Sequence, residues 1–163
     1  MKKVRKQDND NINALLDRAR RYCALSEQCE DAVRQKLVTW GATPAESDSV
    51  VSILFREDYL NDERYARAYC ESKILTQQWG RQKVLYQLRL KHLPRAAVDS
   101  GMASISEEDY LRVLVNVAQK KIAELQVSVE DPHLLRQKLN NFLLSRGFSA
   151  PEINKVKNDI PEL

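Results

Sequence analysis

The sequence predicts an all-α protein in which three three-helix units follow one another as an elongated array. Apolar residues recur at three- and four-residue spacing, and strict apolar–polar alternation never holds for the length of a strand. The chain has 43% hydrophobic residues but only 4 glycines and 5 prolines among 163 residues, which favours helices with short connections. Leu37, Leu88 and Leu143 mark a repeat because they lie 51 and 55 residues apart.

Each of these leucines is followed by a turn and then by a proline that opens the next helix. The turns are Trp40-Gly41, Lys91-His92 and Arg146-Gly147, and the prolines are Pro44, Pro94 and Pro151. In such arrays each unit mainly contacts its neighbours, so we expect an elongated molecule that bends at its joints. A single compact bundle of nine helices is the structural alternative.

The first part of the chain predicts a tail and one three-helix unit. Residues 1–11 are basic and polar, and we expect a flexible tail there, followed by a first unit over residues 12–58. Its first helix covers about 12–24. The second covers about 27–40, with Ser26 as its N-cap and Gly41 in a left-handed conformation at its end. Thr43 and Glu46 form a capping box that starts the third.

The second unit is predicted over residues 59–105 and the third over residues 106–163. Asn61 caps the first helix of the second unit, another helix covers about 81–91, and Pro94 opens a short third helix. In the third unit a long helix covers about 107–125. The N-caps of its three helices are Ser106, Asp131 and Ser149.

The cysteines predict a reducing compartment. Cys23, Cys29 and Cys70 form an odd set without a C-x-x-C pair, so neither a disulfide framework nor a zinc-ribbon spacing is present. We expect three buried thiols in a cytoplasmic protein. No apolar run has the length of a membrane span, and the basic start lacks the apolar stretch of a signal peptide.

The motifs that accompany catalysis are absent from the sequence. His92 and His133 have no second metal ligand at a useful spacing, and no phosphate-binding glycine loop occurs. We expect no enzyme activity, no metal and no cofactor. Two acidic clusters begin helices, where carboxylates stabilise the helix dipole, and we prefer this role to a nuclease-type metal site. They are Asp58, Asp62 and Glu63, and Glu107, Glu108 and Asp109.

Charge is segregated along the chain. Residues 61–95 hold eight Lys and Arg against three Asp and Glu, whereas residues 23–60 and 96–163 are acidic. Lys83 and Lys91 belong to a stripe with four-residue spacing, which predicts an outward basic face suited to phosphates or acidic side chains. For Tyr65 and Tyr69 we expect core packing rather than base stacking. The candidate partner-binding residues are Arg64, Arg67, Lys73, Arg81, Lys83, Arg89 and Lys91.

These same segments resemble the RecX family of bacterial RecA regulators. The signature of that family, tyrosine-leucine-aspartate-aspartate and then aromatic-alanine, is matched by Tyr59-Leu60-Asn61-Asp62-Glu63-Arg64-Tyr65-Ala66. Further similar segments are Gly80-x-x-Lys83-Val84-x-x-x-Leu88-x-x-Lys91, Lys36-Leu37-x-x-Trp40-Gly41, and Lys138-Leu139 through Arg146-Gly147-Phe148. Two positions depart from the pattern, since Asn61 replaces an aspartate and His92 replaces a glycine.

The resemblance implies a regulator of the RecA recombinase, with a role in DNA repair, recombination and the SOS response. Members of the family bind RecA filaments on single-stranded DNA, lie along the filament groove, and suppress its ATPase and strand exchange. We therefore expect a monomer whose partners are the RecA filament and single-stranded DNA, the latter bound directly or through RecA. We expect the basic unit to face either the acidic surface of RecA or the DNA backbone. The alternative is a nonspecific DNA-binding helical-repeat protein without a RecA partner.

Overall fold

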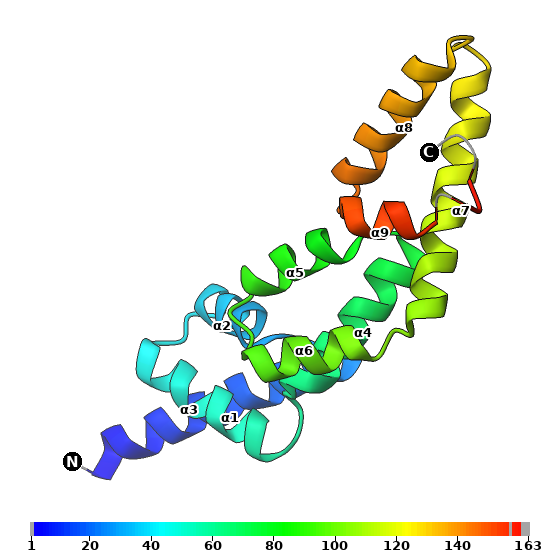
Figure 1. The fold of residues 1–163 in the computed structure, drawn as a ribbon. Coiled ribbons are helices and arrows are strands. Elements are labelled where there is room, and N and C mark those ends of the chain that lie inside the picture. The colour runs from blue at the N-terminus through cyan, green and yellow to red at the C-terminus, as the bar shows by residue number, and fades with distance from the viewer. Residues whose placement is uncertain (1, 157, 161–163) are drawn as a thin grey trace.

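Three three-helix units lie in a row in the computed structural model, which describes residues 2–156 and 158–160 (Figure 1). The first unit consists of α1 (Lys2–Leu25), α2 (Glu30–Thr39) and α3 (Pro44–Arg56). The second consists of α4 (Asp62–Glu71), the π-helical turn η1 (Ser72–Thr76), α5 (Arg81–Arg89) and α6 (Arg95–Ala103). The third consists of α7 (Glu107–Gln126), α8 (Pro132–Ser145) and α9 (Ala150–Lys155). The described ranges contain no strand, and the molecule is elongated, so the predicted fold class is confirmed.

The predicted caps start the helices of this array. In each case the side-chain oxygen of the cap accepts a hydrogen bond from a backbone N–H in the first turn, which satisfies a donor that the helix itself leaves free. Capping boxes are complete at both Thr43 and Ser149. The residues that cap in this way are Thr43, Asn61, Ser106, Asp131 and Ser149.

The internal repeat is visible in both packing and backbone conformation. Leu37, Leu88 and Leu143 are all fully buried. The residue that ends the middle helix of each unit takes a left-handed conformation, with φ of +85° at Gly41, +55° at His92 and +92° at Gly147. His92 therefore keeps the turn that glycine makes in the other two units, although a side chain in this region of φ is strained.

The hydrophobic interior forms two cores, although the chain has three units. One core belongs to the first unit and contains Leu15, Leu37 and Leu54. The other is continuous through the second and third units, where residues such as Leu88 and Phe148 belong to the same cluster. The expectation of a bending joint between every pair of units is therefore corrected, because the second and third units share one core.

Two helix starts differ from their predicted positions. The first helix begins at Lys2 rather than near residue 12, since neither proline nor glycine interrupts residues 2–25; Met1 lies outside the described residues. The second begins at Glu30, and Ser26 is not its N-cap. Cys29 occupies that position without a side-chain capping hydrogen bond, because that side chain is buried in the core of the second and third units. Tertiary packing thus overrides the local capping signal.

Candidate partner-binding surface

The seven basic residues predicted to meet a partner fall into three groups. All of them come from α4, η1, α5 and the turn after α5. Two are held by acidic side chains of the same chain, three are lysines over aromatic rings, and two are exposed arginines. In that order the groups are Arg64 and Arg81, then Lys73, Lys83 and Lys91, then Arg67 and Arg89.

Arg64 ties the first unit to the start of α4. Its Nε atom lies 2.5 Å from Oε1 of Glu27, and its Nη1 atom lies 2.9 Å from Oδ2 of Asp58. The hydrogen bond to Glu27 raises the pKa of the Arg64 guanidinium. A hydrogen bond from Asn61 and the neighbouring Arg64 lower the pKa of Asp58. Arg64 thus connects two units within the chain.

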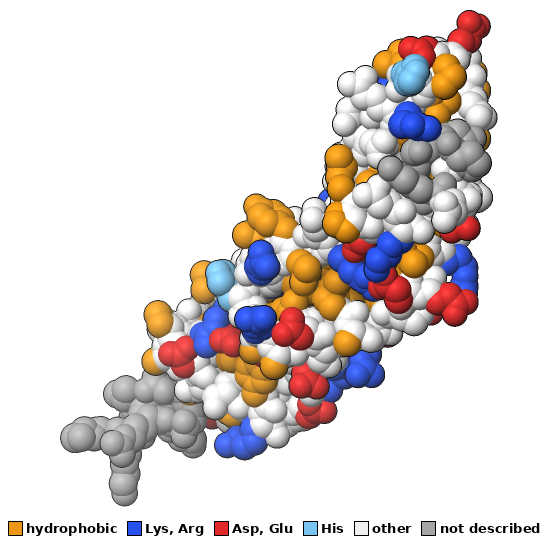
Figure 2. Space-filling model, viewed as in Figure 1, with side chains coloured by type: hydrophobic (Ala, Val, Ile, Leu, Met, Phe, Trp, Pro, Cys, Tyr) orange, Lys and Arg blue, Asp and Glu red, His pale blue; other side chains and the backbone are white. Residues whose placement is uncertain are grey.

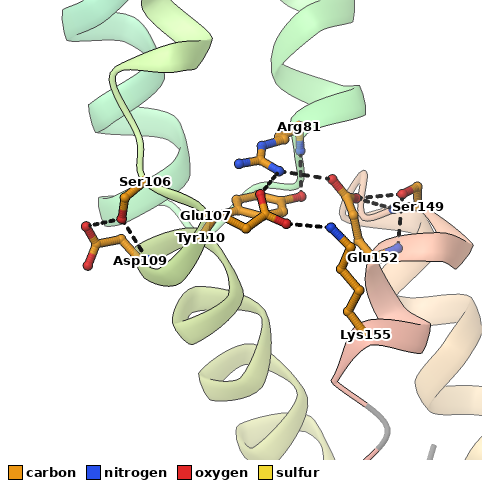
Figure 3. Close-up of polar contacts among 8 residues, drawn as sticks. All are labelled: Arg81, Ser106, Glu107, Asp109, Tyr110, Ser149, Glu152 and Lys155. Atoms are coloured by element: carbon orange, nitrogen blue, oxygen red, sulfur yellow. Dashed lines mark hydrogen bonds and ion pairs between the residues drawn. The ribbon is translucent and has the colours of Figure 1, made fainter.

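Arg81 occupies the joint between the second and third units (Figure 3). Its guanidinium lies over the Tyr110 ring, 3.8 Å from the centroid, and its Nη1 atom lies 2.8 Å from Oε2 of Glu107. Glu152 approaches the same nitrogen at 3.8 Å, and Lys155 binds the other oxygen of Glu107 at 2.7 Å. The backbone N–H of Arg81 donates to the Tyr110 hydroxyl. The guanidinium and the backbone N–H of Arg81 are therefore both engaged inside the chain.

Backbone contacts close the same joint. The N–H of Gly80 donates to the carbonyl oxygen of Arg146 at 2.8 Å. Nη2 of Arg146 donates in return to the carbonyl oxygens of Gln77 and Gln78, at 2.5 and 2.9 Å. A Cβ atom at Gly80 would lie 2.0 Å from the carbonyl carbon of Gly147, so only glycine permits this approach. These contacts thus fix the second unit, which carries the candidate surface, to the third unit.

Three lysines converge on aromatic rings at one side of α5. The ammonium of Lys83 lies 4.3 Å from the centroid of the Trp79 ring, and that of Lys73 lies 5.0 Å from the same ring. The ammonium of Lys91 lies 5.7 Å from the Tyr69 ring. Each contact is a cation–π geometry that leaves the charge near the surface. We call Lys73, Lys83, Lys91, Tyr69 and Trp79 the lysine flank.

Arg89 lies on the other side of α5, at a hollow of about 450 Å³ between α5 and α6. Lys83 and Lys91, the two lysines of the predicted stripe, lie together on the lysine flank, where both are half-buried rather than fully outward. Arg67 is exposed on α4 beside a smaller hollow and has no ion pair among the described residues. We call the larger hollow the arginine hollow; its lining is Leu85, Arg89, Leu93, Arg95, Val98 and Asp99.

Trp79 is not among the residues that the sequence predicted to meet a partner. The ring of this residue is half-buried and contacts lysines from both η1 and α5. The signal in the sequence was that Trp79 precedes Lys83 by four residues. The prediction of core packing is confirmed for Tyr65, which is 9% exposed, whereas Tyr69 stacks on it at the edge of the core with ring centroids 5.9 Å apart.

For the other features considered in the sequence, namely metal ligands, cysteines and membrane spans, the structure gives the following within the ranges that it describes. No group of three or more His, Cys, Asp or Glu side chains there has the geometry to hold a metal ion. The three cysteines are buried, as predicted, and burial raises the pKa of Cys23 and Cys70 to about 11. Among the described helices, none is long and apolar enough to cross a membrane.

The fold and this surface define a helical-repeat protein whose second unit carries basic side chains on two flanks. Family models for the second and third three-helix domains of RecX match residues 61–102 and 107–156. The chain belongs to the RecX family. Of the segments that carried the resemblance in the sequence, those from Tyr59 to Lys91 lie largely within the first of these matches, and the one from Lys138 to Phe148 lies within the second.

Curated relatives support the same assignment. The regulatory protein RecX of Clostridium acetobutylicum is 28% identical over 155 residues, which cover 94% of this chain and 72% of that protein. The regulatory protein RecX of Yersinia enterocolitica is 26% identical, over 93% of this chain and 100% of that protein. The family is thus one of regulatory proteins.

Solved structures confirm the architecture. The crystal structure of RecX from Lactobacillus salivarius superposes with a TM-score of 0.82 at 18% identity, and the match covers 95% of this chain and 99% of that chain. A crystal structure of regulatory protein RecX gives a TM-score of 0.83 at 19% identity, covering 93% of this chain and 74% of that chain. At these identities the likeness speaks for the fold alone.

Proposed function

We propose that this protein binds RecA nucleoprotein filaments and inhibits the RecA ATPase and recombinase activity. Its membership of a family of regulatory proteins named RecX supports this proposal. An elongated array of three units (Figure 1) suits a partner with an extended groove, because such arrays present extended binding surfaces. We assign the activity to a monomer in the cytoplasm that acts without catalysis or a cofactor.

The lysine flank is the observation that carries the proposal. Three ammonium groups from η1, α5 and the following turn lie over two neighbouring rings, Tyr69 and Trp79. None of the three lysines has an acidic partner within 4 Å in the described part of the chain, in contrast to Arg64 and Arg81. Unneutralised charges beside aromatic rings suit a nucleoprotein surface, where phosphates and bases are both presented.

A double variant tests this assignment. Lys83→Ala with Lys91→Ala removes two charges of the flank, and the Cβ atom of residue 83 that packs near Gly147 is kept. We expect the concentration that half-inhibits the DNA-dependent ATPase of RecA to rise about tenfold or more. Lys120→Ala with Lys138→Ala is the matched control, because both lysines are exposed in the third unit and lack an ion pair in the described ranges. Equal inhibition by both double variants would remove the lysine flank from the proposal.

The second candidate function is nonspecific DNA binding without a RecA partner. The same arrangement of lysines and rings favours it, because base stacking and phosphate contacts together bind single strands of any sequence. Such binding weakens steeply with salt, by roughly 0.7 log units of affinity per phosphate contact for each log unit of salt. Tight, salt-sensitive binding to naked single-stranded DNA together with an unaffected RecA filament would favour this alternative.

A further inference from the structure

The side of α5 opposite the lysine flank carries a second surface with different chemistry. Three aliphatic side chains, Leu85, Leu93 and Val98, line the arginine hollow between α5 and α6. Its volume of about 450 Å³ exceeds that of any single amino acid side chain. In Figure 2 hydrophobic side chains are visible in this region, in the middle of the face that is shown, with Lys or Arg side chains beside them.

The crest of α5 extends this apolar surface. Tyr86 on α5 is 59% exposed, and Leu90, which directly follows α5, is 55% exposed. Exposed apolar side chains mark an interaction site when they form a contiguous patch. Tyrosine and arginine are also the residue types that dominate the binding energy of protein interfaces, whereas lysine is depleted there.

The charges at the rim identify the chemistry of the partner. Arg89 is exposed and has no ion pair among the described residues. Arg95 has only Asp99, at 3.5 Å, and its side chain is 94% exposed. An exposed pair of this kind contributes little to stability, so the guanidinium is available to a stronger partner. The rim therefore carries a net positive charge and favours carboxylates, which an arginine binds in a bidentate manner.

The same features distinguish a protein partner from a nucleic acid. The floor of the hollow is aliphatic and Tyr86 is the aromatic residue on the crest beside it, whereas two aromatic rings with lysines over them lie on the other flank. We propose that the arginine hollow receives an acidic segment of RecA in the filament, with one large apolar side chain inserted between α5 and α6 and carboxylates against Arg89 and Arg95. This inference rests on the proposed function and names the part of the surface that contacts the protein component.

Photocross-linking tests the inference directly. A photoreactive p-benzoyl-phenylalanine in place of Tyr86 keeps an aromatic ring at the crest. The variant is mixed with RecA filaments on single-stranded DNA, sedimented, irradiated and mapped by mass spectrometry. We expect a covalent adduct with a RecA peptide in which Asp or Glu residues flank a large apolar residue.

The other outcomes separate the two proposals. Co-sedimentation without a RecA adduct overturns the inference alone, as does an adduct only with DNA or with a second copy of this chain. Absence of co-sedimentation by both the variant and the unmodified protein contradicts the proposed function, and the inference with it. An adduct with a RecA peptide that lacks acidic residues overturns the assigned chemistry.

Affinity measurements provide an independent test. We expect Arg89→Glu and Leu90→Ala each to weaken binding to RecA filaments about tenfold or more. Lys120→Glu and Val127→Ala are the matched controls, because both residues are exposed in the third unit, away from α5. If Arg89→Glu weakens binding to naked single-stranded DNA as much as binding to filaments, the hollow faces DNA and the inference fails. Unfolding midpoints equal to that of the unmodified protein verify that the variants are folded.

Discussion

The N–H of Gly80 donates a hydrogen bond of 2.8 Å to the carbonyl oxygen of Arg146, so the start of α5 is joined directly to the end of α8. The two backbones approach each other where glycine stands on both sides, at Gly80 and Gly147. Because α5 carries both flanks of the candidate surface, this contact fixes the surface relative to the third unit. The regulator consists of a first unit with its own core and a second body made of two units.

Substitution of Gly80 tests the close approach. Gly80→Ala places a Cβ atom 2.0 Å from the carbonyl carbon of Gly147, which forces the second and third units apart. We expect the free energy of unfolding to fall by about 3 kcal/mol, at the upper end for overpacking. Urea unfolding measures it. Gly41→Ala is the control, because no atom lies within 4 Å of its added Cβ and only the strain at φ +85° remains, about 1 kcal/mol. Equal losses at the two positions would contradict the tight joint.

The side chain of His92 strains the turn after α5. His92 has φ +55° where the other two units have glycine, and its Nδ1 atom lies 2.6 Å from Oδ2 of Asp31. The histidine side chain is 79% exposed, so the contact contributes little. We expect His92→Gly to raise the free energy of unfolding by about 0.5–1 kcal/mol, as the relief of strain exceeds the loss of the contact. A decrease in the free energy of unfolding would mean that the contact of His92 with Asp31 outweighs the strain.

The buried thiols are predicted to be unreactive. Burial raises the pKa of both Cys23 and Cys70 to about 11, so roughly one thiol in a thousand is ionised at pH 8. We expect Ellman's reagent to modify the cysteines only as fast as the protein unfolds. A cysteine introduced by Val127→Cys, at a position 88% exposed, is expected to react at once and calibrates the assay. Rapid modification of the native thiols would contradict their burial.

Acid is predicted to weaken the joint at Glu107. Hydrogen bonds from Lys155 and then Arg81 lower the pKa of this carboxyl group. A carboxyl whose pKa is lower in the folded state stabilises the fold above its unfolded pKa, and this contribution is lost as the pH falls through the folded pKa. We expect Glu107→Gln to lower stability at neutral pH and to match the unmodified protein in acid. Since Glu107 is 47% exposed, solvent screens the effect. A difference that is independent of pH would contradict the assignment.

Local signals predicted the helices well. Thr43, Asn61 and Ser149 cap as expected, since a cap and the backbone N–H that donates to it lie within three residues of each other. The repeat of buried leucines predicted the order of the units. Two helix starts were predicted wrongly, those at residues 2 and 30. The absence of Pro and Gly from residues 2–25 can be read from the sequence, whereas the burial of Cys29 in the core of other units is encoded by no local pattern.

The surface was harder to predict because its charges pair over long distances. Arg64 pairs with Glu27, which lies 37 residues away, and Arg81 pairs with Glu107, which lies 26 residues away. A count of charges along the sequence treats both arginines as available to a partner. The division of Lys83 and Arg89 between two flanks follows from helical geometry, but which flank meets aromatic rings depends on where Trp79 and Tyr69 pack.

The central claim is tested most directly by the ATPase activity of RecA on single-stranded DNA, measured with increasing amounts of this protein. The account predicts that ATP hydrolysis falls as the protein is added, and that more protein is needed when Lys83 and Lys91 are both alanine. Unchanged hydrolysis at concentrations well above that of RecA, with the DNA still fully coated by RecA, would contradict it.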